Sequence, residues 1–456
     1  MNNLSTLLLG AVLLPAIACA EQYPWHHEDC PRSSGLHSNS GEAPILGWSE
    51  TVRATNSPWV RLEFGKVALG ARSWLAVVST TAQQTQRLDS VSIRHWRNVS
   101  GALRGTEVRV ELWVGPGDND ISVDLVRLMA GEEFSPGQIE TLCGADNRIS
   151  TRDDRVGRLF GGGCTAWLTP NGAICTAGHC GEGTINGFFE VNVPSSSSNG
   201  TPTPAAPEDQ FPVDDSNIRW FFDSAISDAA NRGQEYTVCG LFPNSNTGQY
   251  AHQRGFLRVT QYVPAEDTST LRITGYGRDQ DPAGSGGGRN SDNYTEQTAT
   301  GPYRGQTDDG TRVYHSYTTD TEPANSGSPM MYSSGGYSFS LGIHTLGGCA
   351  SDGTGANSGT SFNKSTLANA LNTWQGASAR YMDFVSYPGV VTRTGSIFRP
   401  ASNLTEGYSL VPSGGTLHIV PGSYPKTVTG NTVTLGVGST KTVTLRALYG
   451  SAVIGQ

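Results

Sequence analysis

Apolar and polar side chains alternate in several short stretches of the first third of the chain. A two-residue period is typical of strands with one buried and one exposed face, and turn residues separate the stretches. We therefore expect a small antiparallel β-sandwich over residues 46–132, preceded by a flexible lead-in from 21 to about 45. The apolar positions that carry the pattern are Val60, Leu62, Phe64, Val108, Val110, Leu112, Val114, Ile121, Val123 and Leu125.

One stretch has the period of a helix. Leu367, Leu371 and Trp374 fall on one face at spacings i, i+4 and i+7. Ser365 stands just before them, where its hydroxyl can cap the first turn. This stretch predicts a helix near the end of the central part of the chain.

The C-terminal part, 378–456, has a third pattern. Threonine- and valine-rich runs recur there at a spacing of about 10 to 16 residues, with glycine between them. Short, regularly spaced strands of this kind predict a separate β-rich unit, either a partial solenoid or a small sandwich. The runs are 416–420, 432–435 and 442–445.

Length and composition agree with a mostly β protein of several domains. The 456 residues are enough for two or three domains, and the 57 glycines suit many tight turns. The formal net charge of -9 leaves no broad basic face, so nucleic acid is not an expected partner.

The first 20 residues resemble a signal peptide. An apolar run from Leu7 to Ala18 ends in Ala18-Cys19-Ala20, whose small residues suit cleavage before Glu21. The run is too short for a comfortable membrane span, and no Lys or Arg precedes it. We expect a secreted protein, extracellular or periplasmic, without stable membrane insertion. A lipid on Cys19 is the competing interpretation, for which Ala16 is a poor match.

Two short motifs carry the candidate chemistry. Residues 176–180 read Thr-Ala-Gly-His-Cys, and residues 325–329 read Asn-Ser-Gly-Ser-Pro. A serine hydroxyl becomes a good nucleophile when a neighbouring imidazole takes its proton during the attack. In this order, and about 150 residues apart, the two motifs resemble those of the chymotrypsin-like serine peptidases.

The resemblance implies a chymotrypsin-like double β-barrel over residues 143–377, between an accessory or pro-domain at 21–142 and the C-terminal unit. It also implies hydrolysis of protein or peptide substrates through an acyl-enzyme, without a cofactor. His179 would be the general base and Ser326 the nucleophile. The N–H groups of Ala324 and Ser326 would form the oxyanion hole, although that family usually has glycine at the position of Ala324. A Cys164–Cys180 disulfide is implied as well.

The third member of the triad is an acid between the two motifs. Residues 223–226 read Asp-Ser-Ala-Ile and match the Asp-x-Ala-hydrophobic pattern of the family, directly after an apolar run. Asp223 is therefore predicted to accept the Nδ1–H of His179. Asp228 and Glu235 are the nearby alternatives.

Two cues to substrate specificity conflict. His344 and Thr321 match the positions that hold the substrate's glutamate carboxylate in the glutamyl endopeptidases, and both side chains are suitable donors. Asp320 stands six residues before Ser326, where trypsin-like enzymes bind arginine or lysine. Donor chemistry favours glutamate at the cleaved position, provided that Asp320 points away.

Seven cysteines remain once the signal peptide is removed, and an odd number leaves at least one unpaired. Cys175 and Cys239 either form a bridge or are two buried thiols. Cys349 has Cys143 as its expected partner, which leaves Cys30. No pair has the spacing of a zinc site, so no metal is expected.

Two rival functions stay open. The chain could be a catalytically impaired peptidase fold that serves as a binding module, because Ala324 departs from the family pattern. It could also be a surface adhesin, in which the flanking β-rich units matter more than the barrels.

Overall fold

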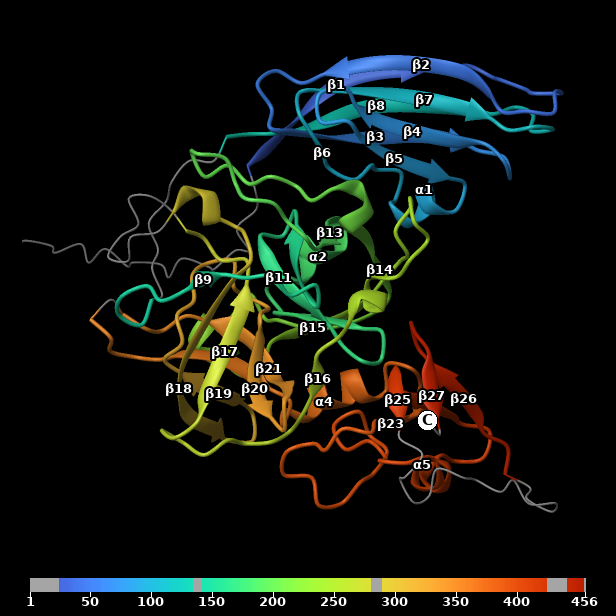
Figure 1. Ribbon diagram of the computed structural model, residues 1–456. Coiled ribbons are helices and arrows are strands. Elements are labelled where there is room, and N and C mark those ends of the chain that lie inside the picture. The colour runs from blue at the N-terminus through green and yellow to red at the C-terminus, as the bar shows by residue number, and fades with distance from the viewer. Residues whose placement is uncertain (1–23, 134–141, 280–288, 351, 425–440, 455–456) are drawn as a thin grey trace, which may run out of the picture.

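The computed structural model describes residues 24–133, 142–279, 289–350, 352–424 and 441–454. A β-sandwich lies at the top of Figure 1, two barrels lie below it, and a C-terminal unit lies at the lower right. The predicted signal peptide and the run 432–435 fall outside the described residues. No helix among the described residues is both long and apolar enough to cross a membrane.

The N-terminal unit is a sandwich of two four-stranded antiparallel sheets, as predicted. One sheet has the order β1 (Trp25–Ser33), β8 (Ser122–Gly131), β3 (Trp59–Ala68) and β6 (Leu103–Arg104). The other has the order β2 (Ile45–Arg53), β7 (Glu107–Val114), β4 (Trp74–Ser79) and β5 (Gln84–Asp89), followed by the short helix α1 (Ser92–His95).

The predicted flexible lead-in is wrong over residues 25–33, which form strand β1. This strand pairs with β8 from Trp25↔Gly131 to Ser33↔Asp124. It is an edge strand with mostly exposed side chains, so its sequence lacks the apolar alternation of a half-buried strand. Backbone pairing, which the side-chain pattern does not report, holds it in place.

The first barrel is closed by six antiparallel strands. In spatial order they are β10 (Val156–Phe160), β11 (Cys164–Leu168), β12 (Ile174–Thr176), β15 (Tyr236–Leu241), β14 (Gln210–Phe221) and β13 (Phe188–Glu190). The helices α2 (Gly181–Asn186) and α3 (Asp228–Asn231) lie in its connections, together with the 3₁₀ turns η1 (Pro207–Asp209) and η2 (Ala251–Arg254).

The second barrel closes because β21 (Tyr337–Leu346) pairs with both β20 and β22. Its other strands are β17 (Thr270–Gly275), β18 (Gln297–Asp308), β19 (Val313–Tyr317), β20 (Pro329–Ser334) and β22 (Asn357–Ser361). The short strands β9 (Ile149–Ser150) and β16 (Arg258–Val259) extend this sheet, and η3 (Asn290–Asp292) precedes β18. The two barrels together form the predicted chymotrypsin-like double β-barrel.

The predicted helix is α4 (Ser365–Asn372), and it buries Leu367 and Leu371. Ser365 is its first residue and not its cap, and Trp374 lies beyond its end. The C-terminal unit that follows is built from parallel strands and the helix α5 (Leu404–Leu410). One sheet contains β23 (Arg380–Met382), β24 (Thr416–Ile419) and β26 (Thr444–Ala447), and the other contains β25 (Gly422–Tyr424) and β27 (Ala452–Ile454).

The C-terminal unit docks on both barrels. The carboxylate of Asp383, fully buried, pairs with Arg258 of β16 at 2.7 Å. Tyr449 stacks on His252 with ring centroids 4.8 Å apart. The same ring lies over the turn between β11 and β12, where a Cβ on Gly172 would come within 2.5 Å of it.

The sandwich and the first barrel share one hydrophobic core. The ring of Trp59 lies 4.8 Å from that of Phe160, and Phe160 stacks on Phe188 at 4.7 Å. Arg61 occupies a polar position of the alternating pattern, yet it is only 4% exposed and its guanidinium lies 5.1 Å from the Phe188 ring. At Arg61, the face of β3 that the pattern marks as polar is thus covered by the barrel.

The shared core leads to a prediction for Trp59→Ala. Removing this indole should destabilise the protein by about 3 to 5 kcal/mol, and the loss should reach the barrel as well as the sandwich. The buried free thiols of Cys175 and Cys239 lie in the barrel, so in mild urea they should react faster with a thiol reagent than in the wild type.

Trp74→Ala is the matched control, because Trp74 stacks on Trp113 within the sandwich itself. Mass spectrometry distinguishes labelling of the two barrel thiols from labelling of Cys30. Equal labelling of the barrel thiols in both variants would contradict a shared core.

Candidate active site

His179 follows β12, and its position is set by the pairing of that strand with β15. Thr176 lies opposite Thr237, and continuing this register by two residues places Gly178 opposite Glu235. A Cβ on Gly178 would lie 2.2 Å from the carbonyl oxygen of Phe221 and 2.7 Å from the Cβ of Glu235. Glycine is therefore required at 178, because the chain before His179 passes directly against the residues that lead into β15.

Glu235 binds His179 twice. Its Oε2 lies 2.7 Å from Nδ1 of the ring and accepts the backbone N–H of His179 at 3.0 Å. Both side chains are almost fully buried, with 9% of His179 and 4% of Glu235 exposed. The second barrel contacts the backbone of the same residue, because the hydroxyl of Thr360 donates to the carbonyl of Glu235 at 2.8 Å.

The surroundings of the ring favour its protonated form. Burial acts to lower the pKa of His179, but the charge of Glu235, its hydrogen bond to the ring and the charge of Asp228 outweigh burial. The net effect raises the pKa of His179 above its ordinary value. A carboxylate on Nδ1 also fixes the ring so that Nε2 is the atom free to exchange a proton.

Asp223 does not hold the place predicted for it. Its carboxylate accepts the N–H of Ala225 at 2.9 Å, and its backbone binds the side chain of Asn231. Asp223 lies in the connection after β14, whereas Glu235 stands directly before β15, the neighbour of the histidine strand. The register of β12 and β15, and not the local four-residue pattern, determines which carboxylate lies beside His179. The position of Glu235 just before the apolar run 236–241 was the available signal.

Ser326 lies in a turn of the second barrel that packs against the first barrel. The backbone N–H of Thr165 on β11 donates to the carbonyl of Ser326 at 2.9 Å, and the sulfur of Cys180 lies 4.0 Å from the same oxygen. The next residue, Gly327, has φ +94°, and a Cβ there would lie 1.9 Å from the carbonyl of Thr165. The contact brings the serine turn beside the residue that follows His179.

The hydroxyl of Ser326 is half-buried and has no hydrogen-bond partner among the described residues. The N–H groups of Ala324 and Ser326 likewise bind no acceptor within the described part of the chain. Ala324 has φ +77°, a left-handed conformation that costs a residue with a Cβ roughly 1–2 kcal/mol. The hydroxyl of Thr165 donates to the carbonyl of Ala324 at 3.0 Å and holds this conformation.

The three residues expected to set specificity have different surroundings. The carboxylate of Asp320 is buried and accepts the backbone N–H groups of Cys143 at 2.7 Å and Asn147 at 2.9 Å. The hydroxyl of Thr321 accepts from the side chain of Asn357 at 2.9 Å. Both carboxylate oxygens of Asp320 thus accept hydrogen bonds from the backbone of the protein itself.

His344 is hydrogen-bonded through its backbone to the turn that carries Ser326. Its carbonyl accepts the N–H of Gly327 at 2.7 Å, and its N–H donates to the carbonyl of Ser328 at 2.8 Å. The hydroxyl of Tyr317 lies 2.6 Å from Nδ1 of the ring. Burial, with the nearby charge of His179, lowers the pKa of His344 to about 3, so the ring is neutral at physiological pH.

Two disulfides brace the site. Cys164 is bonded to Cys180, as the resemblance implies, and Cys143 is bonded to Cys349. Such bonds are compatible with an extracellular protein. Cys175 and Cys239 are buried thiols on paired strands, one residue out of register, and their side chains belong to different core clusters.

A metal does not fit the one sulfur-rich group at the site. Ligand atoms of Cys164, His179 and Cys180 lie within 4.8 Å of one another, but the two cysteines are bonded to each other. A disulfide has no thiolate to offer, so this trio cannot act as a metal centre.

Comparisons with known proteins found no matching family model and no matching curated protein. Among solved structures, the chain is similar to the protease Anisep from Arthrobacter nicotinovorans, with 16% identity and a TM-score of 0.33 over 49% of this chain and 98% of that one. It is also similar to the thermostable serine protease AL20 from an extremophilic microorganism, with 13% identity and a TM-score of 0.32 over 48% and 96% of the two chains.

The hydrogen bond between Glu235 and His179 gives a direct prediction. Glu235→Gln should lower the pKa of His179, because the charge that stabilises the imidazolium is removed. Titration of the ring proton by NMR measures this pKa. Asp223→Asn, the matched control, should leave the pKa unchanged, and a fall in the control alone would restore Asp223 as the partner.

Proposed function

We propose that the protein is a serine endopeptidase that hydrolyses peptide bonds through an acyl-enzyme. The observation that carries this proposal is the buried Glu235–His179 pair. It lies beside the turn that contains Ser326, whose hydroxyl has no hydrogen-bond partner among the described residues. Ser326, His179 and Glu235 would form the triad, with Glu235 in the place first expected of Asp223. The positions of the three residues in the two barrels, and not the weak likeness to solved proteases, support the assignment.

In each half-reaction of the proposed mechanism, His179 first accepts a proton and then donates it. Ser326 Oγ attacks the carbonyl carbon, and Nε2 of His179 takes the hydroxyl proton. Glu235 keeps Nδ1–H in place and stabilises the imidazolium, while the N–H groups of Ala324 and Ser326 bind the oxyanion. The imidazolium gives its proton to the leaving amine, and water then hydrolyses the ester by the same route.

The finer proposal concerns the residue before the cleaved bond, for which we favour glutamate. Asp320, the rival determinant for arginine or lysine, already accepts two backbone N–H groups and is 1% exposed. If the Tyr317 hydroxyl donates to Nδ1 of His344, the neutral ring carries its proton on Nε2 and can donate it to a carboxylate. Binding of that carboxylate would raise the pKa of His344.

We also propose that residues 1–20 are removed on secretion and that 143–377 is the catalytic unit. The two disulfides support an extracellular site of action. The core that 21–142 shares with the first barrel supports its retention as an accessory domain rather than its loss as a pro-domain.

A fluorophosphonate probe separates the peptidase from its rivals. The wild-type protein should form a covalent adduct at Ser326, located by peptide mass spectrometry. An intact, folded protein without an adduct at Ser326 would favour the binding module or the adhesin.

Kinetics of the triad variants give a second prediction. Ser326→Ala and His179→Ala should each lower kcat about a million-fold, because members of a triad act as a unit. Glu235→Gln should lower it about 10⁴-fold, since the ring loses its orienting acceptor. Asp223→Asn should leave kcat near that of the wild type, and a loss in Asp223→Asn similar to that in Glu235→Gln would contradict the assignment of the acid.

Specificity is tested by sequencing the cut ends of a peptide library. Cleavage should follow glutamate, and His344→Gln should reduce the preference for glutamate over glutamine about tenfold or more. Asp320→Asn should not change the preference. Cleavage after arginine or lysine would contradict the glutamate pocket but leave the peptidase assignment intact.

A further inference from the structure

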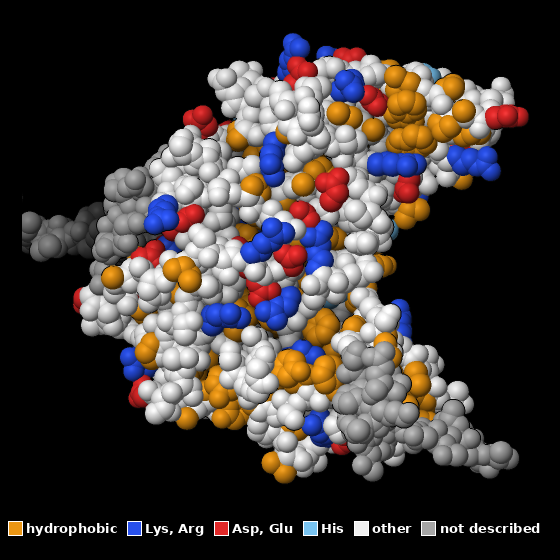
Figure 2. All heavy atoms as spheres, viewed as in Figure 1, with side chains coloured by type: hydrophobic (Ala, Val, Ile, Leu, Met, Phe, Trp, Pro, Cys, Tyr) orange, Lys and Arg blue, Asp and Glu red, His pale blue; other side chains and the backbone are white. Residues whose placement is uncertain are grey.

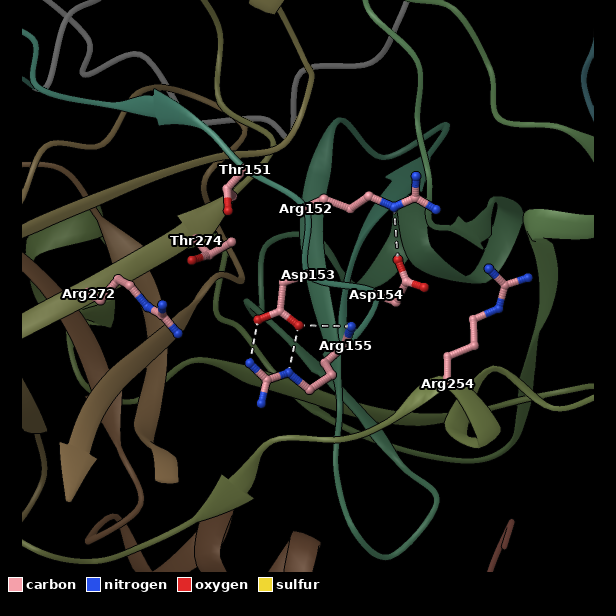
Figure 3. A pocket seen from close by; sticks show the side chains of 8 residues that line it. All are labelled: Thr151, Arg152, Asp153, Asp154, Arg155, Arg254, Arg272 and Thr274. Atoms are coloured by element: carbon pink, nitrogen blue, oxygen red, sulfur yellow. Dashed lines mark hydrogen bonds and ion pairs between the residues drawn. The ribbon is translucent and has the colours of Figure 1, made fainter. Parts of the chain in front are cut away.

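A charged pocket with a cavity volume of about 560 Å³ lies on the seam between the two barrels, and none of the proposed catalytic residues lines it. The segment that enters β10, the turn η2 and the strand β17 all line it (Figure 3). Figure 2 shows basic and acidic side chains close together in the middle of this face. The pocket is lined by Thr151, Arg152, Asp153, Asp154, Arg155, Arg254, Arg272 and Thr274.

Three of the four arginines already have carboxylate partners. Asp153 binds the guanidinium of Arg155 through two hydrogen bonds of 2.6 Å. Arg254 pairs with Asp209 outside the pocket at 2.6 Å. Arg152, with 70% of its side chain exposed, makes a single 3.4 Å contact with Asp154.

Arg272 is the exception. Within the described part of the chain its guanidinium has no carboxylate partner, and Nη2 makes only 3.4 Å contacts with Met331 and Ser338. Its Nε is buried without any acceptor among the described residues. In Figure 3 this guanidinium points toward the Asp153–Arg155 pair across the pocket. Because the guanidinium has no carboxylate partner among the described residues and points into the pocket, its terminal nitrogens can donate to an anion from outside.

The charges and the size indicate which anion. With Asp209, which pairs with Arg254, the four guanidinium groups face three carboxylates, which leaves a formal excess of one positive charge on a chain whose net charge is -9. Asp153 and Asp154 would repel a phosphate dianion more strongly than a single carboxylate. The volume also exceeds what one small ion fills, so a carboxylate on a peptide chain matches both properties.

We propose that this pocket binds an acidic segment of a peptide, with a side-chain carboxylate on Arg272 and the exposed Arg152 at the rim. The site is separate from the catalytic cleft and does not depend on the proposed peptidase activity. A substrate that binds here would be held to the protein by acidic residues other than those at the cleaved bond.

The test measures binding of a fluorescein-labelled peptide, acetyl-Ala-Asp-Glu-Asp-Ala, by fluorescence anisotropy at low ionic strength. Full-length Ser326→Ala protein is used so that the probe is not cut. The wild-type pocket should bind saturably and lose affinity as salt is added. Adding Arg272→Gln should raise Kd about tenfold or more, since a charge-assisted hydrogen bond is lost.

Arg304→Gln is the matched control, because Arg304 lies on β18 of the same barrel and is paired with Asp267 on the surface. Its Kd should equal that of the parent. Arg152→Gln, at an exposed position that folding does not require, should weaken binding about threefold, which keeps the test valid if Arg272→Gln does not fold.

Three results would overturn the proposal. The first is unchanged affinity in both Arg272→Gln and Arg152→Gln, and the second is the absence of saturable binding. The third is loss of binding in His344→Gln with no loss in Arg272→Gln, which would place the peptide in the catalytic cleft. Displacement of the peptide by inorganic phosphate more readily than by acetate would contradict the choice of a carboxylate.

Discussion

The site depends on the hydrogen bond between the Glu235 carboxylate and Nδ1 of His179. The bond requires that β12 and β15 pair in one register and that residue 178 carry no Cβ, because the Cβ of Glu235 fills that space. Thr360 of the second barrel anchors the same strand through the Glu235 carbonyl. A single residue, Glu235, therefore couples the orientation of the ring, through its carboxylate, to the contact between the two barrels, through its backbone carbonyl.

Thr165 plays the corresponding part for Ser326, the proposed nucleophile. Its backbone N–H binds the carbonyl of Ser326, and its hydroxyl binds the carbonyl of Ala324. Gly327 packs against the carbonyl of the same residue, in a space too small for a side chain. A single residue of the first barrel thus fixes both ends of the turn that the second barrel contributes. This support offsets the left-handed conformation of Ala324.

Much of the fold follows from local sequence patterns, because the alternating apolar positions of strands β3, β7 and β8 are buried in the sandwich core. The exceptions have physical reasons. Arg61 sits at a polar position but is covered by the barrel, and β1 is an edge strand held by backbone pairing. The spacing of apolar residues along the chain reveals neither burial by a neighbouring domain nor the pairing of an edge strand.

Some residues of the candidate site can likewise be predicted from local sequence patterns, and others cannot. His179 and Ser326 stand in short motifs whose glycines the geometry requires, so the sequence identifies them. Glu235 stands in no motif, and only the pairing of β15 with β12 brings it to the ring. Asp223 fits a local pattern that the register does not use, and Asp320 is turned away by backbone donors that arrive from more than 170 residues earlier in the chain.

The most direct test is a crystal structure of the protein after reaction with a phosphonate ester analogue of a glutamyl peptide. We expect a covalent bond from Ser326 Oγ to phosphorus, with the phosphoryl oxygen bound by the N–H groups of Ala324 and Ser326 and with Nδ1 of His179 still hydrogen-bonded to Glu235. A phosphonate bonded elsewhere, or a His179 ring turned to Asp223, would contradict this expectation.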